Sequence, residues 1–201
     1  MIAPPERSPE RDAALERLLP HVGELGWTRA ALRRAAGPDA DLLFPGGAAD
    51  MVEAYIDLMD RRMVAHAAPQ LPSQRLSQRV RTLIATRLEL AGGHKPAARR
   101  AAFLLALPIN ASLAASCTAR TVDTIWHAAG DTAADFSWYT KRAILAAVYT
   151  TTTLNWMNQA TTDEAALAFL DRRLRDVARI GKLRSRIDAL FPHPTKLRSG
   201  A

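Results

Sequence analysis

The stretch ALERLLPHVGELGWTRAALRRAAGPDADLLFPGGAADMVEAYI, from Ala14 to Ile56, decides the fold of this 201-residue chain. A leucine-rich first helix is expected to end at Gly23. Thr28 can cap a second short helix, which Gly37-Pro38 ends. Pro45-Gly46-Gly47 then breaks a brief segment before a long helix begins. These signals predict short helical elements followed by a long one.

The rest of the chain continues the helical pattern. Aromatic residues make up only 6% of the chain, and no alternating segment rich in valine or isoleucine competes with a helical reading. We therefore predict an all-α fold of about nine helices plus a basic amphipathic C-terminal helix. The expected organisation is a flexible tail over 1–9, a helix-turn-helix-like unit over 10–60, a continuous ligand-binding and dimerisation bundle over 61–178, the amphipathic helix over 179–191 and a tail over 192–201.

Two long segments carry no charge, namely 101–119 and 143–162. Their prolines, hydroxyls and amides make them too polar for a membrane span. They are also too apolar for ordinary surface helices, which show one apolar stripe and one charged face. Such helices are expected to contact several partners at once: a dimer mate, a ligand or another protein. For any single residue, plain core packing remains the alternative.

The N-terminal stretch resembles the three-helix unit of TetR-type transcriptional regulators. The matching positions are Gly26, Trp27, Thr28, Ala35, Ala36, Gly37, Phe44 and Pro45. A DNA reader needs basic and base-contacting side chains on its recognition helix. At that place the chain has Asp39 and Asp41 and no basic residue, so we expect a degenerate helix-turn-helix and no DNA binding.

A second resemblance lies in the stretch that begins at Trp126. It is similar to the signature of a ubiquinone-biosynthesis accessory family, the ninth coenzyme Q protein. The matching residues are Trp126, Gly130, Asp131, Thr132, Asp135, Phe136, Trp138, Tyr139, Thr140, Arg142, Ala143, Leu145 and Tyr149. The resemblance implies a TetR-like fold, a homodimer, an isoprenoid lipid or phospholipid as ligand, and assistance to the hydroxylase that acts on demethoxyubiquinone.

The family resemblance also implies a surface that contacts the hydroxylase. It consists of Ile125, Asp135, Trp138, Tyr139 and Arg142. Tryptophan, tyrosine and arginine are the residues that most often anchor interfaces. For Arg142 the alternatives are a solvated charge or an internal salt bridge.

A long polyprenyl tail makes few hydrogen bonds, so its site should be a sleeve of apolar side chains. The two charge-free segments are the natural walls. The candidate lining residues are Phe103, Leu104, Leu107, Leu113, Leu145 and Val148. No metal and no cofactor other than a bound isoprenoid lipid or quinone is expected.

The chain becomes basic and amphipathic after Leu174. The predicted membrane-binding residues are Ile180, Leu183, Ile187, Leu190 and Phe191, with Arg179, Lys182 and Arg186 around them. Such a helix suits an anionic membrane surface. Docking onto its own protein would give the same periodicity, and Gly181 can split the helix.

The functional hypothesis is a lipid-binding accessory protein without catalytic residues, since the five histidines stand without partners at ligand spacing. One cysteine and no secretory signal favour a bacterial cytoplasmic location, peripheral to the inner membrane. The alternatives are a TetR-type repressor with a hydrophobic effector and a purely structural scaffold.

Overall fold

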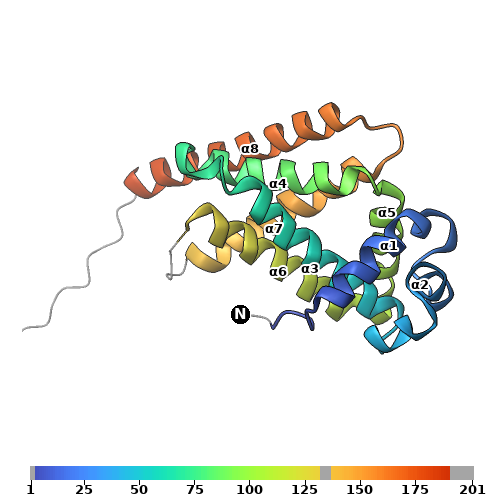
Figure 1. Cartoon of the computed structure of the whole chain (residues 1–201). Coiled ribbons are helices and arrows are strands. Elements are labelled where there is room, and N and C mark those ends of the chain that lie inside the picture. The colour runs from blue at the N-terminus through green and yellow to red at the C-terminus, as the bar shows by residue number, and fades with distance from the viewer. Residues whose placement is uncertain (1–2, 132–136, 191–201) are drawn as a thin grey trace, which may run out of the picture.

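The computed structural model describes residues 3–131 and 137–190, with Ser137, Trp138 and 180–190 described as backbone only. All regular elements among these residues are helical, which confirms the all-α fold. In chain order (Figure 1) they are α1 (Pro9–Leu25), α2 (Arg29–Ala36), η1 (Pro38–Leu43), α3 (Ala48–Ala67), η2 (Leu71–Ser73), α4 (Leu76–Gly92), α5 (Lys95–Leu105), η3 (Pro108–Asn110), α6 (Ala111–Ala129), α7 (Ser137–Met157) and α8 (Asp163–Leu190).

The first three elements and the start of α3 form a small unit at one end of the molecule (Figure 1). The side chains of Ser8 and Thr28 cap α1 and α2 by accepting hydrogen bonds from backbone N–H groups. Gly26 joins the two helices with φ of 72°, a backbone conformation that favours glycine. Leu18, Leu32 and other fully buried side chains fill the core of this unit.

The place of a recognition helix is occupied by η1, a six-residue 3-10 helix. Its Asp41 pairs with Arg33 of α2 at 2.8 Å, and Leu42 is exposed. This ion pair engages Arg33, one of the arginines of α2, within the protein itself. Asp39 and Asp41, the acidic residues behind the expected lack of DNA binding, both lie on η1. The lack of DNA binding itself stays a prediction.

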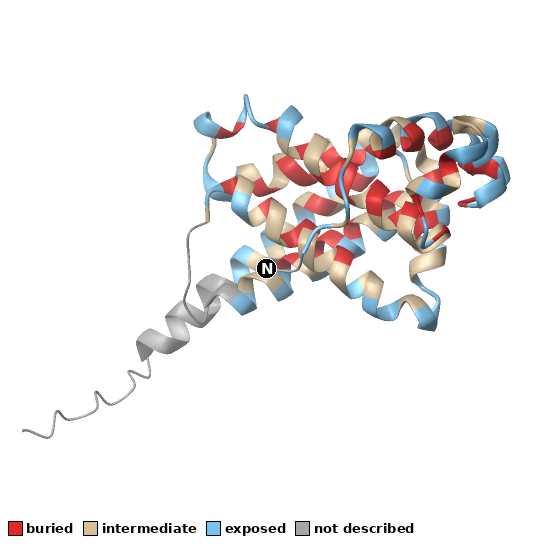
Figure 2. Cartoon of the chain, turned by 60° about the horizontal axis from the view of Figure 1, so that its bottom comes forward, coloured by how far each residue is buried: buried red, intermediate tan, exposed pale blue. Residues whose placement is uncertain are grey.

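The remaining helices form a bundle around a second core. In it α3 packs on α4 and α6, and α7 packs on α6 and α8. Figure 2 shows the buried residues gathered along the facing sides of these helices. Trp156 is fully buried near the end of α7, where its indole Nε1 donates to Asp163 at 2.9 Å and Lys95 lies 4.9 Å from its ring. These contacts fix the turn between α7 and α8 against α5.

The C-terminal part differs from the expected division at residue 179. The backbone of α8 is helical without a break from Asp163 to Leu190, through Gly181. A single glycine inside a helix costs only about 1 kcal/mol, which is too little to end a long helix. The described part of α8 reaches Leu190.

The N-terminal tail also differs from the expectation of a flexible segment over 1–9. Arg7 donates two hydrogen bonds to the mostly buried carboxylate of Asp57 on α3, at 2.6 and 2.9 Å. Bidentate arginine–carboxylate pairs are geometrically specific. This pair holds the chain before α1 against the long helix, and α1 itself starts at Pro9.

Candidate functional site

A cavity of about 260 Å³ lies inside the bundle, between α3, α4, α5, α6 and α7. Both predicted charge-free segments line it, the first with residues such as Ala101 and Cys117, the second with residues such as Tyr149 and Leu154. Ala91, Ala98, Ala101, Ala102 and Ala114 account for much of the wall. The cavity exists because these small side chains leave the space between the helices unfilled.

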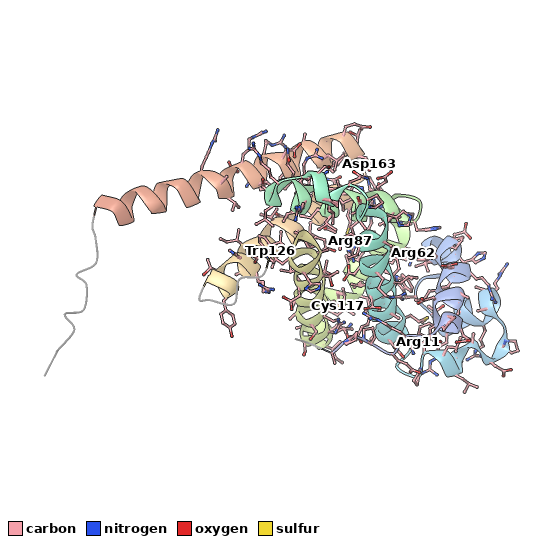
Figure 3. The ribbon with its side chains drawn as sticks, turned by 60° about the vertical axis from the view of Figure 1, so that its left-hand side comes forward. Arg11, Arg62, Arg87, Cys117, Trp126 and Asp163 are labelled. Atoms are coloured by element: carbon pink, nitrogen blue, oxygen red, sulfur yellow. The ribbon has the colours of Figure 1, made fainter. Side chains whose placement is uncertain are left out.

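One end of the cavity is polar and deeply buried. Arg87 of α4 donates from Nε to Asp60 of α3 at 2.7 Å, and both side chains are less than a tenth exposed. Thr121 of α6 donates its hydroxyl to the other oxygen of Asp60, also at 2.7 Å. Figure 3 shows Arg87 and Cys117 inside the bundle, on helices that face each other across this region. Of this cluster, Arg87 and Thr121 line the cavity.

Two tyrosines complete the polar end. The Arg87 guanidinium lies 5.5 Å from the ring centre of Tyr149, and Tyr55 lines the cavity from α3. Burial raises the pKa of Tyr55 to about 12, and it raises the pKa of Tyr149 as well. Both phenols therefore keep their protons at neutral pH and can donate hydrogen bonds.

The single cysteine, Cys117, belongs to the same wall. Burial raises the pKa of its thiol to about 11. The thiolate is the reactive form of cysteine, so this thiol is suited to packing rather than to nucleophilic chemistry.

The exposed part of the cavity lining is mostly apolar. Leu154 of α7 lines the cavity and is 58% exposed, and Ala106 after α5 is exposed too. Leu105 and Met157 are half-buried beside them. We call the buried, hydrogen-bonding part of the lining the inner end of the cavity, and the exposed, mostly apolar part its mouth.

None of the six predicted lipid-binding residues lines this cavity. Phe103 and Leu107 are exposed, Leu104 and Leu113 are half-buried, and Leu145 and Val148 are buried in the core of the bundle. Both charge-free segments line the cavity, but with other residues than these six, whose role in lipid binding stays a prediction. Apolar size guided the choice of leucine and phenylalanine, whereas a cavity forms where the side chains are small.

The predicted partner surface is divided by the structure. Tyr139 at the start of α7 is 72% exposed, and Arg142 one turn later forms an ion pair with Asp123 of α6. Ile125 is fully buried beneath them, so its side chain can support the surface but cannot touch a partner. Asp135 lies outside the described residues, as does the side chain of Trp138.

The predicted membrane-binding residues lie at the end of α8. Arg179 is exposed. The backbone of Ile180, Lys182, Leu183, Arg186, Ile187 and Leu190 is helical, whereas their side chains and Phe191 lie outside the described part of the chain.

The residues missed by sequence reasoning are those of the polar inner end. One signal was available: Arg87 stands three and four positions after Ile84 and Leu83, on the apolar face of its helix. A charged residue on such a face needs a buried partner. No sequence pattern pointed to Asp60 and Thr121, since they come from two other helices.

The described residues contain no group of three or more histidine, cysteine or acidic side chains that could hold a metal ion. No single described helix has the length and apolar character of a bilayer span, although α5 and the η3–α6 segment reach them together across a 92° bend.

Sequence comparisons relate this chain to known proteins. Residues 111–181 match the model of the family described as COQ9. The mitochondrial ubiquinone biosynthesis protein coq9 of Schizosaccharomyces pombe is 32% identical over 182 residues, covering 85% of this chain and 71% of that protein. The corresponding proteins of Rattus norvegicus and Homo sapiens are 30% and 37% identical; the matches cover 84% and 56% of this chain, but only 57% and 36% of those proteins.

Among solved structures, a TetR transcriptional regulator from Nitrosomonas europaea has the same architecture. Its TM-score is 0.68 at 20% identity, and the match covers 85% of this chain and 99% of the regulator. A similarity at this identity supports the TetR-like fold and says nothing about DNA binding.

The comparisons contradict the predicted bacterial cytoplasmic location. The relatives from rat, human, fission yeast and Dictyostelium discoideum are all named as mitochondrial proteins. The prediction was based on a single cysteine and on an N-terminal stretch unlike a secretory signal. A single cysteine fits any compartment that keeps thiols reduced and cannot tell one such compartment from another.

Proposed function

This chain belongs to the COQ9 family, and on that premise we propose that it serves ubiquinone biosynthesis by binding an isoprenoid quinone precursor and presenting it to the demethoxyubiquinone hydroxylase at a membrane. It performs no chemistry itself in this proposal. The observation that carries the proposal is the cavity between α3 and α7, with its apolar mouth and small-residue walls.

The size of the cavity limits what it encloses. Ligand clefts in proteins commonly measure about 300–1,000 Å³. At about 260 Å³ this cavity is slightly smaller than that range. It can take a ring and the first part of a tail, while the remainder of a long polyprenyl chain has to leave through the mouth beside Leu154.

The exposed face of α7 supports the proposed homodimer. Ala143, Ile144, Ala147, Thr150 and Leu154 are all exposed along it, and the helix has no charged residue after Arg142. An uncharged helix face of small and apolar side chains is typical of subunit contacts. A second copy that covers this face would also enclose a tail emerging beside Leu154.

The start of α7 is the proposed contact with the hydroxylase. Tyr139 is exposed there, and the Arg142–Asp123 ion pair anchors the same turn to α6. The end of α8, with Arg179, Lys182 and Arg186 in its sequence, is proposed to bind an anionic membrane surface.

The test is mass spectrometry of the organic extract of the natively purified protein, together with flotation on anionic liposomes. Wild type is expected to carry an isoprenoid lipid and to float with the liposomes. Absence of any isoprenoid together with absence of liposome binding would contradict the proposal.

Two neighbouring alanines of α6 provide a matched control. Ala114 lines the cavity and Ala115 is exposed and does not. Ala114→Phe should fill the cavity and empty the extract of lipid, whereas Ala115→Phe should leave the lipid in place. Thermal unfolding followed by circular dichroism has to show that both variants remain folded, since an overpacked core costs about 1–3 kcal/mol.

The repressor alternative is separated by a gel shift with the DNA upstream of the gene. The proposed function predicts no sequence-selective, salt-sensitive complex. Such a complex would favour the repressor, with the cavity as its effector site.

A further inference from the structure

We propose that the inner end of the cavity selects a neutral, oxygen-bearing ring as the head of its lipid and rejects anionic heads. This inference rests on the proposed function, because it names the chemistry of the ligand that the same cavity would take. It is carried by the buried cluster of Arg87, Asp60, Thr121 and the two tyrosines, which only the folded bundle brings together.

The charge of the cluster determines which heads the inner end rejects. The guanidinium of Arg87 is buried and is always protonated in proteins. Its counter-ion, Asp60, is buried at 2.7 Å and is held by a second hydrogen bond from Thr121. The pair is therefore already neutral as a whole, and a ligand anion placed beside it would lose its hydration without a free cation to compensate.

The hydrogen-bond donors of the cluster determine which heads the inner end accepts. Arg87 has five N–H donors, and the described hydrogen bonds use only Nε, toward Asp60. The hydroxyls of Tyr55 and Tyr149 stay protonated, because burial raises the pKa of both. The side chains at this end thus offer donors, and their complement is a set of acceptors such as ring carbonyl, hydroxyl or methoxyl oxygens.

Size and polarity fix the direction of the ligand. An apolar cavity of about 150 Å³ can hold benzene, so 260 Å³ has room for a substituted ring. The donors lie at the inner end and Leu154 lies at the mouth. The ring oxygens therefore point toward Arg87, and the apolar tail runs outward between α5 and α7.

The experiment compares three probes that share a decyl tail and differ in the head. They are decyl-substituted dimethoxybenzoquinone, decylbenzene and para-decylbenzoate, each titrated into the purified full chain by isothermal calorimetry. The quinone should bind about tenfold or more tightly than decylbenzene, the worth of one or two hydrogen bonds. The benzoate should bind more weakly than decylbenzene.

Removal of single hydroxyls tests the cluster itself. Tyr55→Phe and Tyr149→Phe should each lower the affinity for the quinone about threefold to tenfold and leave the affinity for decylbenzene unchanged. Thr124→Val removes a hydroxyl from α6 outside the cavity lining and should change neither affinity. Each affinity is measured on variants whose circular dichroism matches wild type.

Asp60→Asn tests the charge argument directly. It leaves Arg87 as an uncompensated cation at the cavity wall, so the benzoate should gain affinity while decylbenzene does not. If this variant does not fold, the order of the three probes on wild type still decides the matter.

The outcomes separate the two proposals. If no probe binds to wild type, the lipid-binding function itself fails. If decylbenzene binds as tightly as the quinone, lipid binding stands and the head-selecting end is refuted; tight binding of the benzoate to wild type refutes it equally.

Discussion

Two arginines are buried to nearly the same degree in this molecule, one in each half, and their surroundings differ. Arg11 in the N-terminal unit is 3% exposed and lies 4.4 Å from the ring centre of Phe44. Its terminal nitrogens donate to Asp50 at 2.5 Å and to the carbonyl of Leu43. Both of those nitrogens are occupied by the protein, so this arginine joins α1, η1 and α3.

Arg87 in the bundle is 6% exposed and also has a carboxylate partner and an aromatic neighbour. Its outer side, however, faces a cavity rather than packed side chains. Burial of a cation is therefore no sign of function by itself. What separates the two sites is whether the space opposite the guanidinium is filled.

The largest expected effect is that of Arg87→Ala. Removing one partner of a buried ion pair costs about 3–5 kcal/mol, because the other charge is left uncompensated. Urea unfolding monitored by circular dichroism should show this loss, together with a lost preference for the quinone probe. A stable variant that retained the preference would remove the distinction between the two arginines.

The pH dependence of the same variant sharpens this prediction. Burial raises the pKa of Asp60 in the folded state, and Arg87 opposes that rise in the wild type. Without Arg87 the buried carboxyl of Asp60 favours its neutral form. Its cost to the free energy of unfolding is therefore absent below the ordinary aspartate pKa of about 3.9, and this cost grows as pH rises through the pKa of the folded state. The deficit of the variant relative to wild type should therefore shrink on acidification.

A smaller effect is expected from Arg11→Ala. Asp50 is 19% exposed in its side chain and can be rehydrated, so we expect a loss of about 2 kcal/mol, below the range for fully buried pairs. The affinity of the folded protein for the quinone should not change, since Arg11 is absent from the cavity wall. A change in calorimetric affinity would show that the N-terminal unit contributes to the site.

The smallest effect comes from an exposed arginine, which serves as the reference for the other two. Arg81 pairs with Asp171 and ties α4 to α8 at 2.6 and 3.1 Å, with both side chains more than a third exposed. Asp171→Asn should cost at most about 1 kcal/mol in thermal unfolding, and less in high salt.

The acid dependence of this pair runs opposite to that of Asp60. The hydrogen bonds from Arg81 hold the pKa of Asp171 below its ordinary value. The contribution of the Arg81–Asp171 pair to the free energy of unfolding is therefore present above a pH of about 3.9. It is lost as pH falls through the lowered pKa of Asp171. Asp171→Asn should abolish that part of the acid sensitivity.

Much of the fold could be read from local signals. Thr28 caps α2, Gly26 turns the chain between α1 and α2, and Pro108 separates α5 from α6, all within a few residues of the break that they cause. The expected boundary at residue 179 has no counterpart in the backbone, because α8 continues from Asp163 to Leu190. Gly181, which can split a helix, lies within it, at a cost of only about 1 kcal/mol.

The candidate site was predicted only in outline. The charge-free segments did locate the cavity walls, because a helix with no polar face has to be covered on several sides. The individual lining residues escaped prediction, since the choice between Leu104 and Leu105, or between Val148 and Tyr149, depends on how each helix is rotated about its axis. That rotation is set by packing with other helices.

Caps, breaks and apolar spacing act over a few residues along one chain, so the helical elements could be predicted from the sequence. The TetR-like order of the first three elements and the family followed from the resemblance of signature residues. The position of the cavity and the groups that surround its inner end depend instead on how the helices pack. Arg87, Asp60 and Thr121 come from three helices, separated by 27 and 61 residues from Asp60 in the chain. A buried charge can be recognised from its position in a helix, but the partner that neutralises it, and the space left beside it, exist only once those helices have packed.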